Sequence, residues 1–265
     1  MVTLVLMLSA VSCEGEVAPA PNFDATVAVA VAATRTASDV QEKVAATLSA
    51  PTPTTAPPTP TTAPPTPTTE SASTVNKILD NVLALSENHV TTGVDYFKDG
   101  RYEDAIQEFD QAIQLDPDFA IAFMDRGLAY YHLGENQTAI SDYDKAIQLD
   151  PNYFKAYLHR GLAYSDLGQY QRAIQDADKA IELDWSIAMA YYNRGYAYES
   201  LGQHQRALLD LDKAIALGPS LAMAYVNRSL VYINLGEHQR AIQDTDKAIE
   251  LDPSVAMAYV NRRAA

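Results

Sequence analysis

Aspartates recur along this chain in close pairs, a pattern that could hold a metal ion or perform acid–base catalysis. The members of each pair are two residues apart: Asp142 and Asp144, Asp176 and Asp178, Asp210 and Asp212, Asp244 and Asp246. On a helix, residues two positions apart point in different directions. We therefore expect no metal site and no catalytic carboxylate pair here.

One arginine precedes each of these pairs at a constant distance. The four are Arg126, Arg160, Arg194 and Arg228, each 16 residues before the first aspartate of a pair. Recurrence in four places is typical of a structural contact. The pattern predicts an ion pair between each arginine and that first aspartate, while the second aspartate is expected to face solvent.

Motifs for other chemistries are missing from the sequence. It has no Gly-rich phosphate-binding loop, no HExxH and no GxSxG. The five histidines are scattered, and His204 and His238 share a slot near a predicted turn, where we expect surface positions. We expect no catalytic residue, no metal, no cofactor and no enzymatic activity.

Composition excludes several classes of protein. The 19 Lys and Arg against 34 Asp and Glu give a formal net charge of −15, whereas nucleic-acid binding needs clustered positive charge. One cysteine cannot form an internal disulfide or a cysteine-based zinc site. The longest uncharged apolar stretch, Val2 to Cys13, is shorter than the roughly 20 residues of a membrane-spanning helix.

The N-terminus (residues 1–16) has the features of an export signal. An apolar run is followed by small residues, and Ala10-Val11-Ser12-Cys13 resembles the lipobox of bacterial lipoproteins. That resemblance implies a lipid anchor at Cys13 and a location at the cell envelope. Secretion with cleavage after Ala20 and a cytoplasmic protein with an apolar N-terminus are the alternatives.

A spacer separates this N-terminus from the rest of the chain. Eight of the 14 prolines lie between Pro51 and Pro67, and six of these eight fall within two consecutive copies of APPTPTT. Proline has a fixed φ and no amide hydrogen, so residues 51–72 predict a disordered, extended spacer of polyproline type. In the Ala/Val-rich segment 17–50, a capping pattern at Ser38 predicts a short helix that ends before Pro51.

From residue 86 onward the sequence repeats every 34 residues. Alanines mark one slot: Ala105, Ala139, Ala173, Ala207 and Ala241. Tyrosines mark a second: Tyr96, Tyr130, Tyr164, Tyr198 and Tyr232. Glycines mark a third: Gly100, Gly134, Gly168, Gly202 and Gly236. Prolines mark a fourth, at Pro117, Pro151, Pro219 and Pro253, with Trp185 in the remaining position.

Each unit reads as two helices. In residues 154–187, one apolar stripe at helical spacing precedes Gly168 and a second follows it. Glycine ends helices because it readily adopts left-handed backbone angles. Gly161 and Ala173 are expected to let the two helices approach closely. Since one hairpin cannot bury both stripes, neighbouring hairpins must stack.

The period and its markers resemble the tetratricopeptide repeat (TPR) family. The resemblance covers five units, 86–119, 120–153, 154–187, 188–221 and 222–255, and a partial sixth at 256–265. It implies an all-α, right-handed α-solenoid of about five TPR helix hairpins within residues 73–265. Met257, Tyr259 and Val260 look like an ordinary repeat helix, which favours a chain truncated at Ala265.

In TPR proteins the first helix of each unit lines a concave groove that takes peptides or partner helices. The resemblance implies such a groove here, at Met124, Asp125, Leu128, Tyr131, Lys155, Leu158, His159, Met189, Tyr192, Asn193, Tyr196, Met223, Val226, Asn227 and Leu230. Asn193 and Asn227 are expected to hydrogen-bond a peptide backbone.

These features predict a non-enzymatic scaffold that binds a protein or peptide, exported and similar to bacterial envelope adaptors. A cytoplasmic TPR adaptor is one alternative. The other is an interaction fragment of a larger enzyme or sensor.

Departures from the repeat predict local changes. Trp185 in place of proline should change the turn between units three and four. Ala177 and Thr245 stand where Phe109 and Tyr143 place a ring, which predicts looser packing, and Ser229 replaces the close-packing glycine in unit five.

Overall fold

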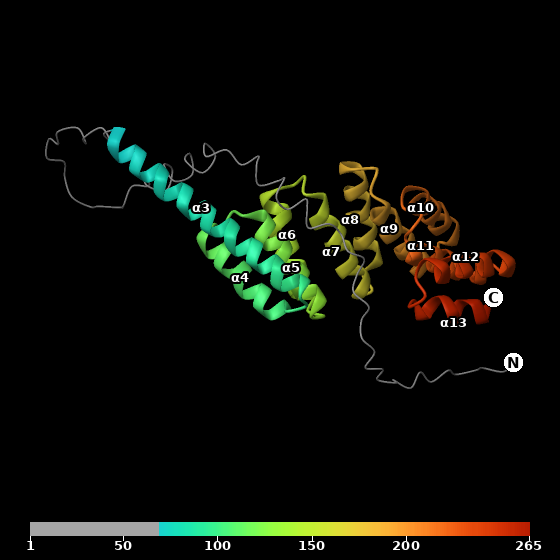
Figure 1. Cartoon of the computed structure of the whole chain (residues 1–265). Helices are drawn as coiled ribbons and strands as arrows, with labels where there is room; N and C mark the ends of the chain where they lie inside the picture. The colour runs from blue at the N-terminus through green and yellow to red at the C-terminus, as the bar shows by residue number, and fades with distance from the viewer. Residues whose placement is uncertain (1–68) are drawn as a thin grey trace.

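The computed structural model describes residues 69–265, with side-chain surroundings from Lys77 onward. This part contains eleven α-helices and no strand, stacked side by side in one elongated array (Figure 1). The helices are α3 (Thr69–Lys98), α4 (Tyr102–Leu115), α5 (Ala120–His132), α6 (Asn136–Leu149), α7 (Phe154–Asp166), α8 (Tyr170–Leu183), α9 (Ala188–Ser200), α10 (His204–Leu217), α11 (Ala222–Asn234), α12 (His238–Leu251) and α13 (Ala256–Ala264).

The predicted solenoid of helix hairpins is confirmed. In units two to five, a 13-residue first helix is followed by a 14-residue second helix that packs against it. The N-terminal segment 1–16 with Cys13, the segment 17–50 and the spacer up to residue 68 lie outside the described residues.

Unit one begins with a much longer helix than the sequence analysis expected. Helix α3 has 30 residues and starts at Thr69, inside the stretch assigned to the spacer. No glycine or proline interrupts residues 69–92, so nothing stops the helix from extending. Figure 1 shows its N-terminal part projecting beyond the other helices.

The turns have simple local causes. The five glycines of the third slot all have positive φ, between 69° and 78°, which confirms their expected role in ending the first helix. Between units, Asp150 Oδ1 accepts a hydrogen bond from the Asn152 amide at 2.9 Å. Asp184 Oδ1 accepts the equivalent bond from Ser186, also at 2.9 Å. The aspartate thus holds this turn without proline. The turn still changes as predicted, because Tyr153 donates its amide to the Asp150 carbonyl at 3.1 Å, whereas no such bond joins Ile187 to Asp184 in the described structure.

The first helices lie on the inner side of the array. Each of α3, α5, α7, α9 and α11 contacts the next first helix along the chain, in addition to its neighbours in sequence. The second helices make no comparable contacts with one another in the described part. Helices that approach each other while their partners stay apart must lie on the inside of the curve, which places a concave face on the first helices.

Arginines connect consecutive hairpins, as well as the two helices of one hairpin. Arg160 donates two hydrogen bonds to Asp176 of its own hairpin, at 2.6 and 2.8 Å, which confirms the predicted pair. It donates a third, at 2.5 Å, to Asp144 of the preceding hairpin. Arg126, Arg194 and Arg228 repeat the arrangement. The second aspartate of each pair is therefore not merely solvated; it joins one repeat to the next.

Glycines in the first helices are matched to the residue that faces them. A Cβ atom added at Gly127 would lie 2.8 Å from Cε1 of Tyr143, whereas one added at Gly161 would meet no atom closer than 3.4 Å. Gly161 is less crowded because Ala177 stands where Tyr143 places its ring. In unit five, the serine side chain at Ser229 has room because the facing position, which Tyr143 occupies in unit two, holds the smaller Thr245. Both side chains are fully buried.

This matching predicts that replacing glycine with alanine changes the free energy of unfolding in opposite directions at two positions. Gly127→Ala is expected to lower the free energy of unfolding by about 1–3 kcal/mol, because the new methyl group overlaps the Tyr143 ring. Gly161→Ala is expected to raise it by about 0.5–1 kcal/mol, since alanine is the better helix former. Urea unfolding followed by circular dichroism measures both. Equal changes in the two variants would contradict the matching.

Candidate functional site

The predicted groove residues all lie on the first helices of units two to five. Helix α5 carries Met124, Asp125, Leu128 and Tyr131; α7 carries Lys155, Leu158 and His159; α9 carries Met189, Tyr192, Asn193 and Tyr196; α11 carries Met223, Val226, Asn227 and Leu230. The solenoid therefore brings them to one concave side, although they come from 107 residues of sequence.

Five of these residues are buried in the structure. They are Met124, Leu158, Asn193, Val226 and Asn227, each at most 8% exposed. They pack within and between the hairpins and offer a partner almost no surface. Met223 is 38% exposed, and the remaining candidates are half-buried with part of each side chain open to solvent.

Asn193 connects two repeats. Its Nδ2 donates to the carbonyl of Leu158, 35 residues earlier, at 3.2 Å. Asn261 makes the same bond to Val226 at 3.1 Å. The amide that was expected to bind a peptide backbone is thus engaged inside the array.

Three tyrosines from two repeats lie near one another on the concave side. Burial raises the pKa of the Tyr131 hydroxyl, and hydrogen bonding to Asp166 raises it further. Burial also raises the pKa of Tyr192 to about 12. Tyr196 lies close enough to both Tyr131 and Tyr192 to raise the pKa of each hydroxyl further. These three rings, from units two and four, define what we call the tyrosine strip.

Tyr170 extends the tyrosine strip, and the sequence analysis did not include it. Its ring meets that of Tyr196 edge-on, with centroids 6.4 Å apart. Tyr170 lies at the start of a second helix, so a search confined to first helices misses it. Asp166 was missed for a different reason, because it is the last residue of α7.

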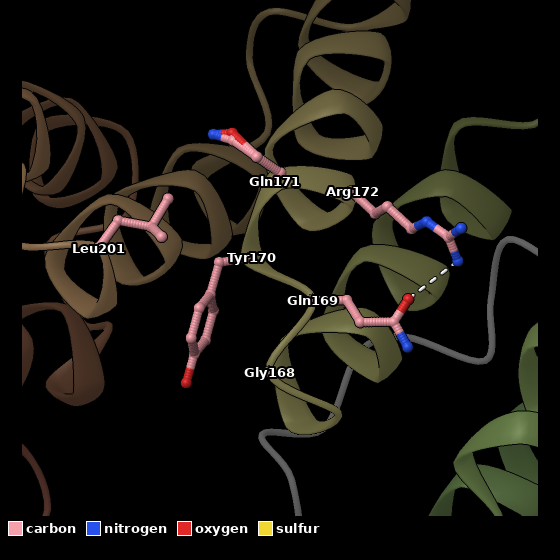
Figure 2. A pocket seen from close by; sticks show the side chains of 6 residues that line it. All are labelled: Gly168, Gln169, Tyr170, Gln171, Arg172 and Leu201. Atoms are coloured by element: carbon pink, nitrogen blue, oxygen red, sulfur yellow. Dashed lines mark hydrogen bonds between the residues drawn. The ribbon is translucent and has the colours of Figure 1, made fainter.

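A shallow hollow of about 410 Å³ adjoins Tyr170 at the turn of unit three. Figure 2 shows the Tyr170 ring and Leu201 beside it, with Gln169 bonded to Arg172 at its other side. The lining residues include no nucleophile paired with a base. The hollow therefore offers surface for contact rather than groups for a reaction.

One repeat slot on the concave side holds ionisable residues. This slot holds Asp125 in unit two and His159 in unit three, whereas it holds asparagine in units four to six. Burial raises the pKa of Asp125 to about 7, and nearby Lys155 opposes this. Burial lowers the pKa of His159 to about 4, and Lys155 and His132 lower it further. Both side chains therefore tend toward their neutral forms near neutral pH.

The remaining expectations concern chemistry and membranes. Within residues 69–265, no group of three or more His, Cys, Asp or Glu side chains is placed to hold a metal ion. None of the described helices combines the length and apolarity that crossing a bilayer requires. His238 is exposed, but His204 is half-buried and its Nδ1 has no hydrogen-bond partner.

Comparisons with known proteins agree with the repeat. Models of the tetratricopeptide repeat match residues 90–154, 142–175, 188–221 and 222–255, and a TPR repeat model matches residues 161–202. Together these matches span residues 90–255, well over half of the chain. No curated protein matches it.

Several solved structures share the fold. The crystal structure of MamA is 29% identical over 62% of this chain and 96% of its own, with a TM-score of 0.54. TTC0263, a thermophilic TPR protein from Thermus thermophilus, is 22% identical over 68% of this chain and 97% of its own, with a TM-score of 0.58. YrrB, described as a TPR protein with an unusual peptide-binding site, is 21% identical over 66% of this chain and 90% of its own, with a TM-score of 0.53.

Proposed function

The chain belongs to the tetratricopeptide repeat family, and we propose that it is a non-enzymatic scaffold that binds a peptide or helical segment of a protein partner. The binding surface in this proposal is the concave side of the first helices. The observation that carries it is the tyrosine strip, because it crosses repeats and leaves each ring partly open to solvent.

The chemistry of the concave side supports this role. Tyrosine rings supply large contact areas, and their hydroxyls supply hydrogen bonds. Met189 and Met223 on the neighbouring helices add flexible apolar contacts that adapt to a partner. The ionisable residues Asp125 and His159 are on different repeats, and Oδ2 of Asp125 has no hydrogen-bond partner.

A location at the cell envelope belongs to the same proposal, with Cys13 as the lipid anchor. It rests on the sequence of the N-terminus. Fractionation with mass spectrometry of the N-terminus tests it. A diacylglyceryl Cys13 is the expected result, whereas an intact Met1 in the soluble fraction would favour the cytoplasmic adaptor. Reading the gene beyond Ala265 tests the larger enzyme or sensor.

Removing exposed groove contacts is expected to abolish partner capture. Tyr192→Ala with Met223→Ala removes a ring of the tyrosine strip and the most exposed of the predicted groove residues. Pull-down of partners from host extract measures capture, and circular dichroism checks that the helices remain. Met223→Asp alone tests the same surface without disturbing a half-buried ring.

The matched control alters the opposite side. Gln175→Ala with Gln243→Ala changes two exposed residues on second helices, and capture should persist. If the groove variants captured the same proteins as the unaltered chain, the proposed binding surface would be wrong.

A further inference from the structure

A second surface breaks the repeat in three places at once. Trp185 replaces proline, Leu209 replaces the Gln or Ser of the other units, and Ala216 replaces Gln or Glu. Trp185 is 67% exposed and Leu209 is 72% exposed, more than any other large apolar side chain in the described residues. Neither has a role in packing that would explain the change.

Lys213 joins these departures into one patch. In units two, three and five, the equivalent lysine bonds the side chain three residues later, as Lys179 does with Glu182 at 2.9 Å. Ala216 removes that partner in unit four. The Lys213 ammonium instead lies 5.8 Å from the ring centre of Trp185 and 5.9 Å from that of Tyr191. Leu209 is one turn before Lys213 on α10, so it faces the same way.

Tyr191 differs from its counterparts as well. Tyr157, Tyr225 and Tyr259 donate their hydroxyls to the carbonyl of the proline six residues earlier, at 3.2 to 3.3 Å. No such bond joins Tyr191 to Trp185 in the described structure. Its hydroxyl therefore remains a donor on the same surface as the exposed rings. We call Trp185, Tyr191, Leu209 and Lys213 the tryptophan patch.

We propose that the tryptophan patch binds the Pro/Thr tract, residues 51–68, of a second copy of this chain. Proline-rich segments of polyproline type dock on aromatic-lined surfaces, and their carbonyls have no internal hydrogen bonds, so they accept bonds from such surfaces. The tract carries two PxxP elements, Pro57 to Pro60 and Pro64 to Pro67. Prolines three residues apart are about 9 Å apart in that conformation. The two rings of the patch lie within about 12 Å of each other, since both flank Lys213.

Charge is consistent with this occupant. The tract has no charged residue from Pro51 to Thr69, and the patch lacks the glutamate that units three and five carry beside their lysine. An uncharged, proline-rich segment therefore meets apolar rings, a hydroxyl donor and a lysine already engaged with those rings.

The reach of the tract favours a second copy over the same chain. Eighteen residues span about 56 Å when extended. The tract leaves from Thr69, at the tip of the projecting part of α3, which stands about 25 Å beyond unit one. The first helices contact one another directly, so α9 lies three steps of about 8–10 Å each from α3. With the projecting part this path takes about 50–55 Å, and a tract stretched over it would have almost no length left with which to bind.

Fluorescence of Trp185 tests the contact, because it is the only tryptophan of the chain. A synthetic peptide of residues 56–68 is titrated into dilute full-length protein. We expect a saturable change in Trp185 emission, and about tenfold weaker binding to Leu209→Gln. That variant restores the residue type of the other units, so it should fold. A peptide with all prolines replaced by alanine is the control and should have no effect.

Sedimentation of the full chain tests the source of the tract. The unaltered chain should associate more strongly as its concentration rises, whereas Trp185→Pro and Pro57→Ala/Pro60→Ala/Pro64→Ala/Pro67→Ala should both remain monomeric. Emission that does not respond to the peptide would overturn the proposal. So would binding that is lost in the groove variant Met223→Asp but kept in Leu209→Gln, or a chain that stays monomeric at every concentration.

Discussion

Replacing Arg194 with alanine is expected to lower the free energy of unfolding by about 3–5 kcal/mol. Its guanidinium donates to Asp210 from Nε and Nη2, both at 2.7 Å, and to Asp178 from Nη1 at 2.6 Å. Hydrogen bonding to Asp210 raises the pKa of Arg194, against the effect of burial. The Asp210 side chain is only 9% exposed, so the variant leaves a buried carboxylate without a partner. Urea unfolding measures the loss.

Two further variants separate the contributions of the Asp178 and Asp210 ion pairs to the free energy of unfolding. The Asp178 side chain is 52% exposed, so Asp178→Ala should cost less than about 1 kcal/mol. Arg194→Met with Asp210→Leu removes the charge and its partner together, and should retain more stability than Arg194→Ala. If Asp178→Ala and Arg194→Ala had the same cost, burial of Asp210 would not be the source of the effect.

The sequence was sufficient to predict the hairpins and half of the arginine contacts. Period, apolar stripes and glycine turns are local properties, and local geometry expresses them directly. Arg160 is 16 residues from Asp176 and also 16 from Asp144. The separation of Arg160 from Asp144 could therefore have predicted the ion pair between repeats. Two aspartates that diverge from one helix can still each find an arginine, because neighbouring repeats present one on either side.

The groove was harder to predict, because residue type does not tell which way a first-helix side chain points. Asn193 and Val226 occupy groove slots yet are turned toward neighbouring helices. Tyr170 reaches the concave side from a second helix. Such details depend on how consecutive hairpins are rotated against one another, and a single repeat unit does not contain that information.

Asp125→Asn is expected to stabilise the protein at neutral pH by about 2–4 kcal/mol. In units four and six, asparagine in this slot donates to the carbonyl 35 residues earlier. The carbonyl 35 residues before Asp125 is that of Val90. An ionised carboxylate has no proton to donate there, and Oδ2 of Asp125 is buried without a hydrogen-bond partner. Asparagine supplies the missing donor.

The sign of the pH dependence follows from the raised pKa of Asp125. Its pKa of about 7 in the folded protein exceeds its ordinary value of 3.8, so the folded state holds more protons between these limits. The free energy of unfolding should therefore fall as pH rises from about 4 to 7. The advantage of Asp125→Asn should appear over that window, remain above it, and shrink toward pH 4.

His159→Asn provides the opposite test in the next repeat. The pKa of His159 is lowered from 6.5 to about 4, so the folded state binds fewer protons between these values. Stability is then lost as pH falls through that window, and His159→Asn should remove the loss on the acid side. Thermal unfolding across pH 4 to 8 compares both variants with the unaltered chain. A stability difference for Asp125→Asn that did not change with pH would show that its carboxylate stays ionised throughout, and that the slot does not select for a hydrogen-bond donor.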